Sequence, residues 1–241
     1  MKNELKQKQV DFLLEYSRFN NYCREYEESY ELLIKTEKKL AEESPTDKEA
    51  RLKHVAALKD EIQKLNDEFD RNDTNYSSAN YQISDRLELC YNELEEVDYE
   101  GVISRISTRA LSSYGRLQQS YYVLKGKHAD FKTYEDAIME ARNKKQQLID
   151  DYAQQVTIQV YGPETEDEFT SEMIADGERI ARRDFSLYAP KSFAPHEEML
   201  QLEDTYTKLV APVEKAMIEA DARTKTIVKM QSDLNKQPTK K

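Results

Sequence analysis

Lysine and arginine side chains gather in two stretches of the sequence, and they are the residues best placed to do chemistry. One set surrounds residue 45, and the other lies within 103–132, which holds six bases and one acid. Clustered bases bind anionic groups, and near an anionic membrane each contributes about 1 kcal/mol. The candidate lipid-binding residues are Lys35, Lys38, Lys39, Lys48, Arg51, Lys53, Lys59, Arg105, Arg109, Arg116, Lys125 and Lys127. The bases around residue 45 have acids among them, so they also fit an ordinary helix surface with salt bridges. The bases within 103–132 also fit a site for an acidic partner instead of lipid.

The sequence offers little catalytic or metal chemistry. His54, His128 and His196 are far apart, whereas metal sites need ligands at short spacing. Metalloprotease, nucleophile-elbow, P-loop and paired-cysteine motifs are absent from the sequence. Paired acids are adjacent in sequence and so do not share a helix face. We therefore expect a protein that is not an enzyme and binds no cofactor or metal, with Cys23 and Cys90 as packed, reduced thiols.

The overall charge limits the classes of partner that the chain can bind. The chain has 36 basic and 47 acidic residues, a formal net charge of −11. Such a balance excludes a general nucleic-acid binder, because phosphate contacts need a surplus of bases. Seven acids and one arginine lie within 85–100, and seven acids and no base lie within 164–178. If the chain binds proteins and no lipid, these two acidic segments are the places where we expect the partner.

Long helices must position these residues. Only 5 of 241 residues are glycine, too few for the tight turns of sheets and phosphate loops. Apolar residues between Phe12 and Leu33 alternate at spacings of four and three, the pattern of supercoiled helices. The expected helices span residues 3–43, 46–97, 101–155, 164–187 and 196–234. A break at Ser44-Pro45 caps the second helix and turns it back on the first as a hairpin. No run approaches the 18 apolar residues that span a bilayer, and we find no signal peptide before the first helix. We therefore expect a cytoplasmic protein, either free or bound to the surface of a membrane.

Several points along these helices stay open. The polar segment 71–80 fits a weak or kinked stretch of one long return helix, or a loop. Residues 156–161 resemble a strand without a partner, and we read them as extended chain or a frayed helix end. Gly115 and Gly126 allow curvature or the close approach of a helix. Pro212 should kink or interrupt the last helix.

The hairpin resembles the Bin/amphiphysin/Rvs (BAR) superfamily. The segments that carry this resemblance are Lys38-Lys39-Leu40, the tip Ser44-Pro45-Thr46-Asp47, the return stretch Leu58-Lys59-Asp60-Glu61-Ile62 and the acidic Asn92-Glu93-Leu94-Glu95-Glu96. The segment from Leu209 to Met230 resembles a BAR first helix, although it follows the hairpin here and precedes it in the family. The resemblance implies a crescent-shaped homodimer that binds anionic membranes through the bases of the tip and the third helix.

The sequence therefore predicts an all-α, elongated, antiparallel coiled-coil bundle that is BAR-like and dimeric. Residues 1–160 would form the hairpin and the third helix, and residues 161–241 would pack on the same bundle. The predicted function is a non-enzymatic scaffold on anionic membranes. The alternative is a helical adaptor or cytoskeletal scaffold that binds proteins and no lipid. A secreted helical effector or pore-former is a third reading, but an apolar inserting segment is missing.

Overall fold

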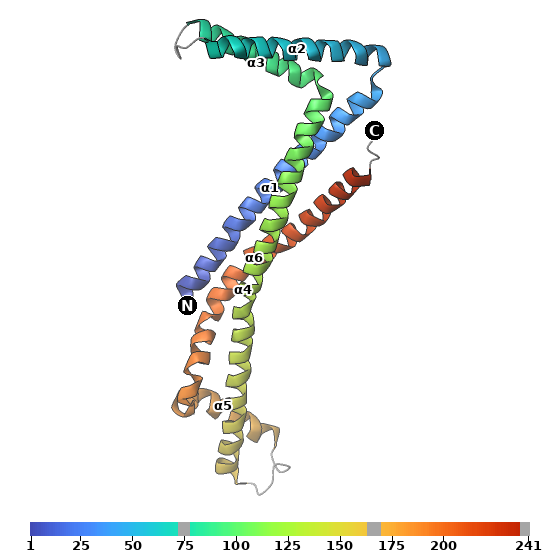
Figure 1. Cartoon of the computed structure of the whole chain (residues 1–241). Coiled ribbons are helices and arrows are strands. Elements are labelled where there is room, and N and C mark those ends of the chain that lie inside the picture. Colours follow the sequence, from blue (N-terminus) through green and yellow to red (C-terminus); the bar gives the residue numbers. More distant parts are fainter. Residues whose placement is uncertain (72–77, 163–169, 237–241) are drawn as a thin grey trace. The chain divides into compact units, whose positions relative to one another are not determined.

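The computed structural model describes residues 1–71, 78–162 and 170–236, and these segments form helices and no strand (Figure 1). The α-helices in the described segments are α1 (Lys2–Glu42), α2 (Pro45–Arg71), α3 (Ser78–Val97), α4 (Tyr99–Tyr161), α5 (Ser171–Tyr188) and α6 (Ala194–Lys236). A short 3-10 helix, η2 (Lys191–Phe193), lies in the linker expected between the last two helices. The prediction of an all-α fold is confirmed.

Two compact units share the three longest helices. Unit 1 consists of Met1–Arg18 and Ser120–Ala222, and unit 2 consists of Phe19–Gln119 and Arg223–Lys241. Each of α1, α4 and α6 contributes one part to each unit. The predicted domains, 1–160 and 161–241, follow the order of the chain, whereas these units combine segments that are distant in sequence.

In unit 1, the first turns of α1 and much of α6 both run antiparallel to α4. The apolar positions expected from the heptads fill its core, with Phe12, Leu124 and Val213 fully buried. Pro212 lies inside α6 and does not interrupt it. Pro212 is exposed, and the proline has no N–H to donate to the carbonyl four residues before it. The Gln9 side-chain amide of α1 donates to the Leu209 carbonyl in the same turn at 3.0 Å.

The end of α4 packs against α5. Residues 156–161 form the last turns of α4, so the reading as extended chain is wrong and the reading as a helix end is the correct one. Val156 and Thr157 are buried, and burial against a neighbouring helix outweighs the β-propensity of this run. Thr157 Oγ1 donates to the Ala153 carbonyl at 2.8 Å. The helix expected at 164–187 begins at Ser171, with Thr170 as its N-cap, and residues 163–169 lie outside the described segments.

In unit 2, α1 runs antiparallel to the first part of α4 and parallel to the last part of α6. Tyr26 joins the three helices, because its ring lies 5.8 Å from that of Tyr114 and its hydroxyl donates to Gln231 Oε1 at 3.0 Å. Arg223 donates to Glu27 at 2.6 Å beside the buried Cys23. Burial raises the pKa of the Cys23 thiol to about 12, so this thiol is an inert part of the core.

Helices α2 and α3 form a hairpin of their own (Figure 1). Val55, Leu58 and Ile62 of α2 pack against Leu94 of α3, and His54 lies 2.8 Å from Glu93. One continuous return helix from 46 to 97 is therefore wrong. The expected fold-back of the second helix on the first is wrong too, because α2 lies along α3 and at an angle to α1 (Figure 1). Residues 72–77, inside the polar segment 71–80, lie outside the described segments. The apolar heptad positions of α2 and α3 pack against each other. The same repeat in the sequence would also fit one long helix whose apolar face packs against α1, so the repeat alone does not distinguish the two arrangements.

Candidate anion-binding site

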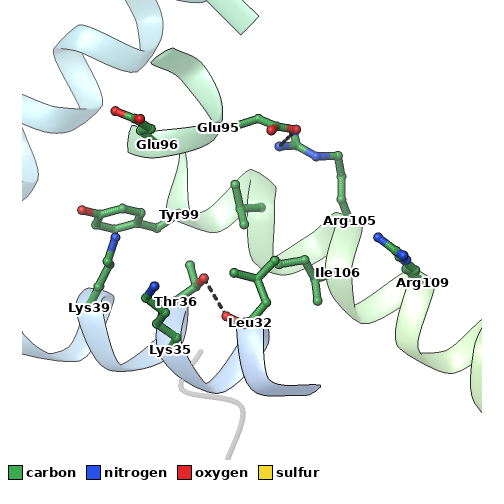
Figure 2. Close-up of a pocket in the computed structure, with 11 residues that line it drawn as sticks. Leu32, Lys35, Thr36, Lys39, Glu95, Glu96, Tyr99, Arg105, Ile106 and Arg109 are labelled. Carbon is green, nitrogen blue, oxygen red and sulfur yellow. Dashed lines mark hydrogen bonds and ion pairs between the residues drawn. The ribbon is translucent and has the colours of Figure 1, made fainter. Parts of the chain in front are cut away.

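A pocket of about 460 Å³ opens in unit 2 between the second half of α1, the end of α3 and the start of α4 (Figure 2). Four of the predicted bases line it: Lys35 and Lys39 from α1, and Arg105 and Arg109 from α4. The other lining residues are Leu32, Thr36, Glu95, Glu96, Tyr99, Val102 and Ile106. The structure thus brings together bases that are about seventy residues apart in sequence.

Helical spacing explains why the two bases of each helix face the same pocket. Lys35 and Lys39 are four residues apart, as are Arg105 and Arg109, and residues at that spacing lie on the same face of a helix. The antiparallel contact of α1 with α4 then sets one pair opposite the other. Apolar side chains of both helices, including Val102 and the buried Ile106, lie between them.

The charges of the pocket are only partly paired. Arg105 lies 3.8 Å from Glu95, and the Lys39 ammonium lies 5.7 Å from the centre of the Tyr99 ring. Within the described part of the chain, no carboxylate lies within 4.0 Å of the Lys35, Lys39 or Arg109 nitrogens. These three cations are therefore available to an anionic ligand.

Arg51 holds the wall behind Tyr99 instead of facing solvent. Its side chain is 7% exposed and donates to Glu43 at 2.8 and 3.0 Å, to Glu100 at 2.8 and 3.0 Å and to the Val97 carbonyl at 3.0 Å. The hydrogen bonds from Arg51 lower the pKa of Glu100 below its usual range. The guanidinium also lies 4.5 Å from the centre of the Tyr99 ring. Arg51 is thus a structural residue, and its place among the lipid-binding candidates is corrected because it is buried and fully paired.

Asp98 fixes the start of α4 beside the pocket. The Gly101 N–H donates to Asp98 Oδ1 at 3.1 Å, and the Lys59 ammonium lies 2.8 Å from the same carboxylate. Burial alone would raise the pKa of Asp98, but the hydrogen bonds from Lys59 and Gly101 outweigh it and the pKa is lowered. Lys59 is therefore engaged in holding α2 to the start of α4.

The remaining candidates lie outside the pocket. Lys38 pairs with Glu42 at 3.8 Å and Lys53 with Glu49 at 2.8 Å, each within one helix. Lys48 is exposed on the first turns of α2. Arg116 pairs with Glu25 at 3.2 Å.

Lys125 and Lys127 belong to unit 1, where Lys125 lies over the ring of Tyr121. The first part of α4 is thus less uniformly available to an anion than its composition indicates.

Sequence reasoning missed the rest of the lining. Glu95 and Glu96 stood out as part of an acidic segment, which we assigned to a protein partner instead of to the wall of a basic pocket. Tyr99 and Val102 carry no periodic signal, because the pocket forms where three helix segments meet.

His128 packs inside unit 1 and belongs to no metal-like cluster of side chains in the described ranges. His128 lies 3.0 Å from Glu214 and 6.4 Å from the ring of Phe12, inside unit 1. Across the described ranges, no three His, Cys, Asp or Glu side chains come together in the manner of metal ligands. Those ranges also contain no helix with the length and apolar character that crossing a membrane requires.

Comparison with known proteins yields no match: no family model, no curated protein and no solved structure resembles this chain. The BAR resemblance therefore stays a prediction from the sequence.

Proposed function

We propose that the chain is a non-enzymatic, peripheral scaffold that binds anionic membrane surfaces through the basic pocket and acts as a BAR-like, elongated helical homodimer. The observation that carries this proposal is the convergence of Lys35, Lys39, Arg105 and Arg109 on one pocket. Glu95 and Glu96 line the same pocket, so the four bases and two acids leave two positive charges in excess, which supply roughly 2 kcal/mol at about 1 kcal/mol for each charge near an anionic surface. This attraction is local, because the chain as a whole is acidic.

The proposal predicts a binding reaction that is sensitive to salt. Charges on a surface are screened over about 8 Å at physiological ionic strength and over about 3 Å at 1 M. Wild-type protein should pellet with phosphatidylcholine vesicles that contain phosphatidylglycerol, release at high salt, and stay in solution with phosphatidylcholine alone.

A charge-reversal pair locates the contact. Lys35→Glu combined with Arg109→Glu should weaken pelleting at least tenfold, since each reversal removes an attraction and adds a repulsion. Lys225→Glu combined with Lys229→Glu is the matched control, because both lysines are exposed on α6 and neither lines the pocket. Equal losses in the two double variants, or pelleting that ignores salt, would overturn the proposal.

A protein-binding scaffold without a lipid role is the second candidate. Helix α3 exposes Tyr81, Leu89 and Tyr91 beside its acidic side chains, with Tyr81 and Leu89 each more than 60% exposed. Apolar side chains of this size next to charges fit a helical partner. Association through them should persist at high salt, where vesicle binding is lost.

A further inference from the structure

A second basic pocket lies in unit 1, where the later part of α4 packs against α5 (Figure 1). Its volume is about 400 Å³, and its lining residues are Arg142, Asn143, Lys145, Gln146 and Ile149 of α4 and Arg182 of α5. Among the described residues, this lining contains three bases and no acid. The membrane proposal uses none of these side chains.

Contacts within and between the two helices hold the bases close together. Arg142 precedes Lys145 by three residues and Gln146 by four, so the three share one face of α4. Arg182 Nη2 donates to Gln146 Oε1 at 3.1 Å. The Lys145 ammonium lies 5.1 Å from the centre of the Phe185 ring, and Phe185 follows Arg182 by one turn of α5. Lys145 and Arg182 are therefore neighbours across the contact of α4 with α5.

Two of the three bases are available to an anion. No carboxylate of the described chain lies within 4.0 Å of the Lys145 ammonium. Arg182 Nη2 lies 3.7 Å from Glu178, but both side chains are about half exposed, and such a pair contributes little. Arg142 is different, because its guanidinium is already paired with Glu203.

Gln146 orients the Arg182 guanidinium. The Gln146 Nε2 donates to Asp150 at 2.6 Å, which leaves Oε1 of the same amide to accept from Arg182. This contact occupies Nη2, whereas Nε and Nη1 of Arg182 have no acceptor within the described chain. These N–H groups are left for a ligand.

We propose that this pocket binds a phosphate monoester, a group that carries about 1.5 to 2 negative charges at neutral pH. Lys145 supplies a compact positive charge, and Arg182 supplies directed N–H donors for the phosphate oxygens. The volume leaves room for the esterified group against the buried side chain of Ile149. This proposal is independent of the membrane function, which depends on the pocket of unit 2.

Equilibrium dialysis of the full chain against methyl phosphate tests the site. Wild-type protein should bind methyl phosphate saturably, and should bind dimethyl phosphate, a diester with one charge, at least tenfold more weakly. Lys145→Gln combined with Arg182→Gln should weaken the binding of methyl phosphate at least tenfold. Lys144→Gln combined with Arg183→Gln is the matched control, because it removes two charges at adjacent positions that do not line the pocket.

Three results of the dialysis would overturn the proposal. They are equal binding of the monoester and the diester, equal losses in the two double variants, and loss of methyl phosphate binding in the Lys35→Glu, Arg109→Glu variant. The last result would assign the phosphate to the pocket of unit 2.

Acetylation of lysines in the wild-type protein locates the site without a substitution. Methyl phosphate at about ten times its dissociation constant should slow the acetylation of Lys145 about tenfold, whereas its exposed neighbour Lys144 should react at an unchanged rate. Unchanged acetylation of Lys145 would overturn the proposal even if the double variant does not fold.

Vesicles distinguish a lipid from a soluble source of the phosphate. Phosphatidic acid carries a phosphate monoester, whereas phosphatidylglycerol carries a diester. A preference for phosphatidic acid that Lys145→Gln combined with Arg182→Gln removes would identify a lipid ligand, and binding of methyl phosphate without this preference would identify a soluble one. Binding of methyl phosphate without binding to any anionic vesicle would overturn the membrane proposal alone.

Discussion

Arg51 illustrates how a charged residue can belong to the framework of a site and not to its surface. It is the one predicted base whose guanidinium is buried, and it joins the end of α1 to the start of α4 through Glu43 and Glu100. Since Tyr99 lies against it, Arg51 also holds one wall of the pocket. Removing one partner of a buried ion pair costs more than the pair itself contributes, because it leaves a buried charge uncompensated.

Replacement of Arg51 should therefore reduce stability strongly. Arg51→Met keeps the aliphatic stem but leaves the largely buried Glu43 carboxylate unpaired, and we expect the free energy of unfolding to fall by about 3 kcal/mol. Arg86→Met is the matched control, since Arg86 pairs with Glu61 at the exposed surface of the hairpin and should cost less than about 1 kcal/mol. Urea unfolding measures both, and a similar loss in the two variants would contradict the structural role of Arg51.

At the scale of the elements, two glycines show how closely the helices pack, because the space around each glycine decides whether a larger side chain fits there. Gly177 is buried where α5 meets α4, and an added Cβ would lie 2.9 Å from the Ala153 carbonyl oxygen and would also collide with Thr157 Oγ1. Gly126 lies inside α4, and an added Cβ would meet nothing within 4 Å of the described structure. The expected close approach of a helix is thus found at Gly177 and not at Gly115 or Gly126 within this chain.

The same substitution should then have opposite effects at the two sites. Gly126→Ala should raise the free energy of unfolding by up to about 1 kcal/mol, because alanine loses less backbone entropy in a helix. Gly177→Ala should lower it by about 1–3 kcal/mol, since α5 must move away from α4 to make room. Thermal unfolding of the two variants decides this, and a stabilised Gly177→Ala would show that α5 does not pack closely here.

At the scale of the whole molecule, the hairpin bears on the proposed homodimer. Its core cluster of Val55, Leu58, Ile62 and Leu94 comes from α2 and α3 alone in the described chain, and two helices cover each other on one face only. An isolated pair of helices gains little stability, and large apolar side chains such as Leu89 stay exposed on α3. In the proposed homodimer a second copy of the chain would cover this surface, whereas in the protein-binding alternative another helical protein would cover it.

Sedimentation equilibrium should therefore report twice the chain mass of 28.3 kDa at micromolar concentration. Tyr81→Glu combined with Leu89→Glu should shift the protein to monomer, because burying an unpaired carboxylate in an interface is strongly unfavourable. Leu187→Glu serves as the control, as Leu187 is 84% exposed on α5, outside the hairpin. A wild-type monomer would remove the dimer from the proposal.

The amino-acid sequence by itself determined that the chain is helical and which face of the first helix is buried. The heptad between Phe12 and Leu33 predicted Phe12, Phe19 and Tyr26 as core positions, and all three are fully buried. The Ser44-Pro45 break was also predictable: Pro45 is the first residue of α2, and Ser44 Oγ accepts from the Asp47 N–H at 3.2 Å. These features depend on residues within a few turns of each other, so the local pattern contains them.

Only the tertiary structure decided which helix faces which. The repeats of 46–97 fit a single helix or two facing ones equally well, and the packing of Leu58 against Leu94 selects the hairpin. Contacts with Glu43, Glu100 and Tyr99 bury Arg51, whereas Lys35 and Arg109 have no carboxylate partner in the described chain, although composition makes the three bases look alike. The pocket forms between segments that are distant in sequence. The energy of each charge depends on its neighbours in space, and the spacing of residues along the chain does not reveal those neighbours.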